Sequence, residues 1–79
     1  MKYRDIIFFQ DEAASPILEI FNEDPEKALE HMKEWDNGEG YESDEPMWGA
    51  ADCHSYHDDY VISYNRNIGY IGLTHVTKD

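Results

Sequence analysis

The chain of 79 residues is long enough for a single domain, residues 1–79, and too short to bury a large core, so a partner or a homodimer would add to its stability. Apolar residues make up 41% of the chain, which argues against wholesale disorder, and no apolar run approaches the roughly 20 residues that span a bilayer. Eighteen acidic residues against six basic ones give a net charge of −12, which disfavours direct binding to nucleic acid or to an anionic membrane.

Two further features indicate the compartment. The N-terminus lacks an apolar signal segment, and Cys53 is the only cysteine, so no disulfide can form within the chain. We therefore expect a cytoplasmic protein.

The first half of the chain predicts a hairpin of two strands. Residues 5–10 form a short apolar run rich in β-branched and aromatic side chains, which is typical of a buried strand. Residues 16–22 are ambiguous, because Ala and Glu nearby favour a helix, whereas Pro16 and a run of Ile, Leu and Phe favour a strand. We interpret residues 16–22 as a second strand.

A helix follows with clear boundary signals. Asp24 is a good N-cap, and Pro25 suits the first helical position. Gly38 and Gly40 should end the helix. Its apolar residues share one face, as their spacing of one, three and three shows: Ala28, Leu29, Met32 and Trp35.

Residues 36–59 read as a long acidic loop, because Gly and Pro recur and no regular period appears. Met47 and Trp48 should pin this loop to the core. Residues 60–65 and 68–77 then alternate as two strands of a hairpin, with Gly69 and Gly72 indicating a bulge or a close approach of a neighbour. The predicted fold is α+β, a small antiparallel sheet of two hairpins with one helix packed on a face, in the order ββαββ.

Two stretches of the sequence contain side chains that could bind a metal ion. A calcium loop starting at Asp36 fails, because glycines occupy positions three and five, where side-chain oxygens are needed. Cys53, His54 and His57 could hold a transition metal, although a second paired cluster is missing. A small metal-binding protein that uses this cluster is therefore the alternative function.

Catalysis has weaker support. Cys53 lies among carboxylates, which raise rather than lower the pKa of a thiol. No phosphate-binding glycine loop precedes a helix. We expect no enzyme activity and no cofactor.

Aromatic residues on the strands, Phe8, Tyr60, Tyr64 and Tyr70, could stack on single-stranded RNA. The net charge opposes this, and we expect amphipathic tyrosines at the rim of a sheet core instead.

The carboxylates themselves are the main candidate site. Glu26, Glu30 and Glu34 repeat every fourth residue, so a helix places them in one row about 6 Å apart. The following segment could extend this row into an acidic stripe. The predicted partner-binding residues are Glu26, Glu30, Glu34, Asp36, Glu39, Glu42, Asp44 and Glu45. Such a stripe would attract a basic protein surface, including one that normally binds DNA.

Three segments, "EKALEHMKEWDNGE", "WGAAD" and "YVISYNRNIGYIGL", resemble those of small, uncharacterised acidic proteins of bacteria and their mobile elements. The resemblance covers residues 26–73 and implies a helix followed by a hairpin, without an activity to carry over. It favours a bacterial or phage setting. The sequence thus predicts a non-enzymatic acidic binding protein, in its sharper form a DNA-mimic inhibitor of a nucleic-acid-binding or defence protein.

Overall fold

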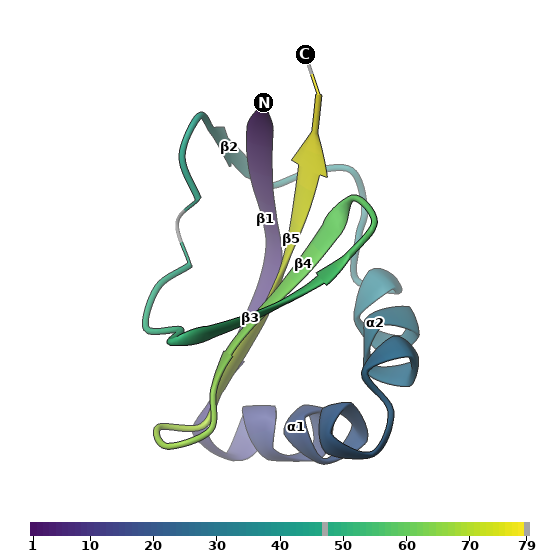
Figure 1. Cartoon of the computed structure of the whole chain (residues 1–79), viewed down its shortest axis with the longest axis vertical. Helices are drawn as coiled ribbons and strands as arrows, with labels where there is room; N and C mark the ends of the chain where they lie inside the picture. The colour runs from purple at the N-terminus through teal and green to yellow at the C-terminus, as the bar shows by residue number, and fades with distance from the viewer. Residues whose placement is uncertain (47, 79) are drawn as a thin grey trace.

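The computed structural model describes residues 1–46 and 48–78. Within these residues, five antiparallel strands form one sheet in the order β2-β1-β5-β4-β3 (Figure 1). The strands are β1 (Lys2–Gln10), β2 (Tyr41–Ser43), β3 (Cys53–His57), β4 (Tyr60–Asn65) and β5 (Tyr70–Thr77). A 3-10 turn, η1 (Asp11–Ala13), leads into α1 (Ala14–Glu23), and α2 (Pro25–Lys33) follows directly.

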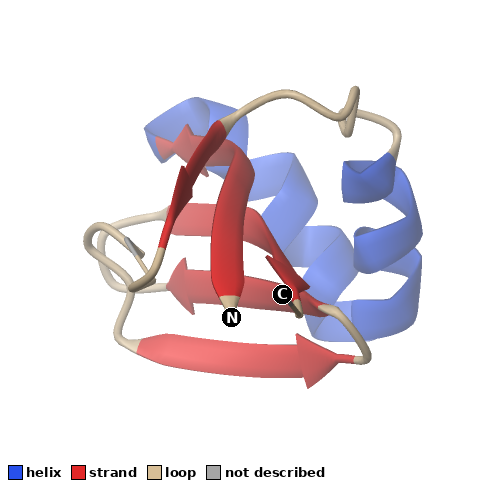
Figure 2. Ribbon diagram, turned by 90° about the horizontal axis from the view of Figure 1, so that it is seen from above, coloured by secondary structure: helices blue, strands red, loops and turns tan. Residues whose placement is uncertain are grey.

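Both helices lie on one side of the sheet, and the connection from β2 to β3 lies on the other (Figures 1 and 2). The main core forms where the apolar faces of α1 and α2 meet the inner face of the sheet. Its buried members are Ala14, Ile17, Leu18, Phe21, Ala28, Leu29, Met32, Ile62, Ile71 and Leu73. We refer below to the covered face and the open face of the sheet.

A bulge in β1 decides which of its side chains reach each face. The pairing of β1 with β5 shifts between Asp5 and Ile7. Arg4 precedes the shift and lies on the covered face, whereas after it Ile7 and Phe9 pack against the core. The extra residue therefore brings Asp5 and Phe8, three positions apart, to the same open face, where both line one hollow.

The predicted order ββαββ is wrong, although the α+β class is right. Residues 16–22 belong to a helix, because Ala14, Ile17, Leu18 and Phe21 recur at helical spacing and all four are buried. Pro16 lies in the first turn of α1, where its missing N–H leaves no hydrogen bond unmade. β1 consequently pairs with β5 and β2 rather than with its neighbour in sequence.

The second helix is confirmed. Asp24 caps it, its side chain accepting hydrogen bonds from the backbone N–H groups of Glu26 (3.1 Å) and Lys27 (3.4 Å). Pro25 occupies the first turn, as predicted. The regular helix ends at Lys33, so Trp35 lies just beyond it and packs edge-on against Phe9, with ring centroids 5.8 Å apart.

The segment 36–59 is not one long loop, because it contributes β2 and β3, the two edge strands. Trp48 contacts Tyr3 and His54 on the open face. The expectation for Met47 lies outside the described residues. The C-terminal hairpin is confirmed as β4 and β5, joined through residues 66–69. Among the helices that the structure describes, none has the length and apolarity needed to cross a membrane.

Candidate functional site

Seven of the eight predicted partner-binding carboxylates are exposed, and Asp36 is the exception. The seven follow α2, the segment that leaves it, and the edge strand β2: Glu26, Glu30, Glu34, Glu39, Glu42, Asp44 and Glu45. Asp44 is paired with Lys2, whose Nζ lies 2.6 Å from its Oδ1. Seven of the predicted carboxylates are thus exposed, and one of these seven, Asp44, is paired within the fold.

Asp36 turns inward and forms an ion pair with Arg4, at 2.9 Å between Nη2 and Oδ1. Burial would raise the pKa of Asp36. The Gly38 backbone N–H, the Arg4 guanidinium and the Tyr60 hydroxyl outweigh it, and hold this pKa below the ordinary value of 3.8. Asp36 therefore stabilises the fold, and its carboxylate is turned away from any partner.

Arg4 also organises the polar cluster around it. Its guanidinium donates to the carbonyl oxygen of Glu39 (2.6 Å) and faces Nδ1 of His75 at 3.2 Å. Because a guanidinium can only donate, Nδ1 of His75 accepts, and its Nε2–H donates to Asp59 at 2.8 Å. The positive charge of Arg4 is thus paired with groups inside the fold.

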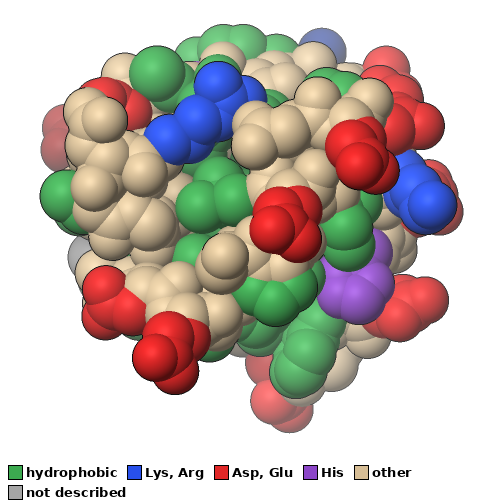
Figure 3. Space-filling model, turned by 90° about the horizontal axis from the view of Figure 1, so that it is seen from below, with side chains coloured by type: hydrophobic (Ala, Val, Ile, Leu, Met, Phe, Trp, Pro, Cys, Tyr) green, Lys and Arg blue, Asp and Glu red, His purple; other side chains and the backbone are tan. Residues whose placement is uncertain are grey.

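The row of glutamates on α2 is exposed along its length. Glu26 accepts a hydrogen bond from Nδ1 of His57 (2.9 Å), and Glu30 lies 3.9 Å from Lys33. Negative charge is not confined to this row, because acidic side chains are also spread over the face in Figure 3. Any test of the row therefore needs a control that removes the same charge elsewhere.

His57 also contacts Ser55, whose Oγ lies 2.7 Å from Nε2. Hydroxyl, imidazole and carboxylate thus follow one another as in serine hydrolases. Such an enzyme also needs a substrate pocket beside the nucleophile, and the hollows on the open face and near the termini are lined by other residues. We interpret the Ser55–His57–Glu26 contacts as a tie between β3 and α2.

Cys53, His54 and His57 do not converge. Cys53 pairs with Tyr64 and His57 with Tyr60, both on the covered face, whereas His54 pairs with Ser63 on the open face and stacks on Trp48. Among the described residues, no group of three His, Cys, Asp or Glu side chains could hold a metal ion. A hydrogen bond with Asp52 raises the pKa of the Cys53 thiol, which weakens it as a nucleophile.

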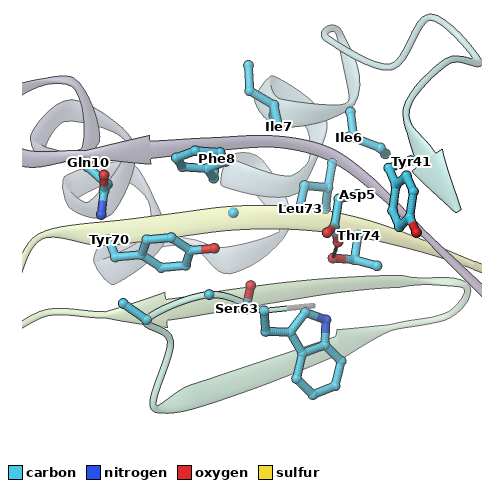
Figure 4. A pocket seen from close by; sticks show the side chains of 14 residues that line it. Asp5, Ile6, Ile7, Phe8, Gln10, Tyr41, Ser63, Tyr70, Leu73 and Thr74 are labelled. Carbon is cyan, nitrogen blue, oxygen red and sulfur yellow. Dashed lines mark hydrogen bonds between the residues drawn. The ribbon is translucent and has the colours of Figure 1, made fainter. Parts of the chain in front are cut away.

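The open face carries a hollow of about 520 Å³ that the sequence does not predict (Figure 4). β1, β5 and β4 form its floor, and β2 and the connection to β3 form its sides. Four of its lining residues are aromatic: Phe8, Tyr41, Trp48 and Tyr70. Phe8 and Tyr41 remain 63% and 67% exposed at its rim, so both rings are accessible to a ligand.

Three glycines shape this hollow. Gly72 leaves room for Phe8 to stack on Tyr70 at 6.0 Å, since a side chain there would come within 3.2 Å of Phe8 Cβ. A Cβ added at Gly49 would likewise lie only 3.0 Å from the Tyr70 hydroxyl oxygen. At Gly40, φ is +126° and any Cβ would collide with the backbone carbonyl of Asp5, so only glycine lets β2 bring Tyr41 beside β1.

Polar side chains stand among the apolar ones in the floor of the hollow. Among the described residues that line it, Asp5 alone is charged, and its Oδ1 accepts a hydrogen bond from Thr74 at 2.8 Å (Figure 4). Tyr70 is buried; desolvation and the Asp5 charge raise the pKa of its hydroxyl above 10.0, so the hydroxyl stays neutral. Together with Ser63, these groups offer several oxygen acceptors beneath aromatic rings.

Only some residues of this site could be anticipated from the sequence. The sequence predicts a bulge or a close approach of a neighbour at Gly72, and in the structure Phe8 and Tyr70 stack on each other above this glycine. Tyr60 and Tyr64 lie on the covered face instead, where Tyr64 contacts Phe21 and Tyr60 stacks on His75. Asp5 was missed, because the bulge that turns it toward Phe8 has no evident signature in the sequence.

Comparison of the chain with protein-family models, curated proteins and solved structures finds no match. The resemblance to small acidic bacterial proteins stays a prediction.

Proposed function

We propose that this chain is a non-enzymatic, cytoplasmic binding protein whose acidic covered side engages a basic protein surface. The observation that carries the proposal is the row formed by Glu26 and Glu30, exposed on successive turns of α2, and by Glu34, exposed at its C-cap. Like charges at this spacing oppose helix formation by a few tenths of a kcal/mol per pair, so the row slightly lowers the stability of the helix.

The placement of basic side chains supports this proposal. Arg4 is buried in contacts with Asp36 and His75, and Arg66 lies over the rings of Phe21 and Tyr64. Neither neutralises the α2 row. Lys33, 3.9 Å from Glu30, offsets only part of the charge of the row, so a surface rich in Lys and Arg would meet a net negative field, which favours fast association.

The sharper form of the proposal is mimicry of DNA, with inhibition of a nucleic-acid-binding or defence protein as the outcome. Phosphates and the α2 carboxylates are both regularly spaced anions that a basic groove would attract. In this form the chain and duplex DNA compete for one site on the partner.

A purified peptide of about ten arginines tests the general proposal. Binding should weaken steeply as salt rises, because exposed charges are screened within about 10 Å at 0.1 M salt. The triple variant Glu26→Gln, Glu30→Gln, Glu34→Gln should bind at least about tenfold more weakly than the wild type, a loss of about 1.4 kcal/mol. Thermal unfolding of the variant checks that the loss of the His57 contact has not unfolded it.

The matched control changes Glu12, Glu19 and Glu23 to Gln. These exposed residues lie on η1 and α1, and the substitution removes the same three charges. The control should bind within about threefold of the wild type. Equal losses in both triples would show that net charge, and not the α2 row, governs binding, and would overturn the proposal.

A further inference from the structure

We propose that the hollow on the open face receives an arginine side chain of the basic partner. The inference rests on the proposed function for the nature of the partner and adds a second, specific contact on the opposite side of the sheet. It is drawn from the lining of the hollow rather than from the overall charge.

The charge of the lining selects a cation. Asp5 is its sole charged group, and no Lys or Arg is among the lining residues that the structure describes. An apolar ligand would bury this carboxylate together with the Ser63 and Tyr70 hydroxyls without new hydrogen bonds, which is costly. An anion would face Asp5 directly. A cation instead gains from the carboxylate and from the faces of the rings.

The shape of the lining favours guanidinium over ammonium. Phe8 stacks nearly parallel to Tyr70, at an interplanar angle of 20°, and both Phe8 and Tyr41 keep much of their surface free. A flat, weakly hydrated guanidinium stacks on such rings. The five N–H donors of a guanidinium can also donate hydrogen bonds to the oxygens in the floor of the hollow. Oδ2 of Asp5 is one such acceptor, because the hydrogen bond from Thr74 uses Oδ1.

The test is an NMR titration of the ¹⁵N-labelled full chain with N-acetyl-arginine amide. We expect saturable shifts of the amide signals of Asp5, Phe8, Tyr41, Gly49 and Gly72. The neutral analogue N-acetyl-citrulline amide should bind at least about tenfold more weakly, since it lacks the charge but keeps the shape. Equal binding of the two analogues would overturn the proposal, as would tighter binding of N-acetyl-lysine amide.

Three variants locate the contact. Asp5→Asn keeps an oxygen for Thr74 and should weaken binding about tenfold or more. Phe8→Ala removes an exposed ring and should weaken it severalfold. Gly72→Ala, which places a methyl group against Phe8 and the Tyr70 hydroxyl without changing charge, should also weaken it. Unchanged affinity in Asp5→Asn and Phe8→Ala, both folded by circular dichroism, would contradict the assignment.

The α2 triple variant separates this inference from the proposed function. Because the α2 row lies on the other side of the sheet, that variant should bind N-acetyl-arginine amide within about twofold of the wild type. A loss as large as that of Asp5→Asn would show that general attraction, and not the hollow, holds the arginine. If this variant loses oligo-arginine binding but still binds N-acetyl-arginine amide, the result supports the arginine site in the hollow.

Discussion

A single cation, Arg4, holds together segments that are far apart in the sequence. Its side chain contacts Asp36 at the end of α2, the carbonyl of Glu39 before β2, and His75 on β5. The Arg4 and Asp36 side chains are only 9% and 15% exposed, so solvent screens this pair less than an exposed one. This contact fixes the path of the chain as it crosses from the helices to the edge strand.

Asp36→Asn should therefore destabilise the protein by about 1–3 kcal/mol at neutral pH, because it leaves the buried Arg4 charge without its partner. Urea unfolding of the wild type and the variant measures this difference. A change in the free energy of unfolding below about 0.5 kcal/mol would show that the pair contributes nothing.

The same comparison has a defined pH dependence. The pKa of Asp36 is lowered in the fold, so its contribution is fully present above pH 3.8 and is lost as the pH falls through the folded value. The difference in the free energy of unfolding between the wild type and Asp36→Asn should therefore become smaller below about pH 4. Both proteins should still lose stability in acid, because the hydrogen bond with His75 also lowers the pKa of Asp59.

At the scale of elements, the sequence predicted the parts with strong local signals. α2 has a capping aspartate and a proline in its first turn, and the C-terminal hairpin alternates cleanly, so both were predicted correctly. α1 was missed because Pro16 and its apolar side chains outweighed the spacing of Ala14, Ile17, Leu18 and Phe21. The spacing was the better guide.

The edge strands could not be predicted from local sequence. β2 has only three residues and exists because Tyr41, Glu42 and Ser43 pair with β1, more than thirty positions earlier in the chain. Its register depends on the close approach of Gly40 to the Asp5 carbonyl. Such non-local pairing leaves no periodic signal in a segment so short.

Gly40→Ala should therefore separate β2 from β1. We expect a loss of about 2 kcal/mol or more, because φ is +126° and the new methyl group would collide with backbone. Gly38→Ala is the matched control, since its φ is +81° but no atom lies within 4 Å of the added methyl group. Hydrogen exchange should show faster exchange of the Tyr41 and Ser43 amides in Gly40→Ala. Equal effects of the two substitutions would contradict this role.

At the scale of the whole molecule, the sheet separates two different surfaces. The covered side carries the exposed carboxylates of α2, and the open side carries an aromatic hollow with one carboxylate at its floor. The sequence showed the first surface, because helical spacing can be read directly from residues 26–34. It did not show the second, because four strands, a bulge and three glycines must meet before the hollow exists.

The sequence likewise could not show which carboxylates of the predicted acidic stripe are paired within the fold. Composition showed that residues 36–45 were acidic, but not that Asp36 would turn inward to Arg4 or that Asp44 would pair with Lys2. These pairings depend on the order of the strands. The role of the remaining carboxylates in partner binding stays a prediction.

Affinity capture from a lysate of the host tests the central claim most directly, with the wild type and the two charge-matched triple variants as baits. Basic or nucleic-acid-binding proteins should bind at low salt, elute at high salt, and be released by duplex DNA. Glu26→Gln, Glu30→Gln, Glu34→Gln should lose them, whereas Glu12→Gln, Glu19→Gln, Glu23→Gln should retain them. Capture of neutral or acidic proteins, or identical capture by both variants, would contradict the account.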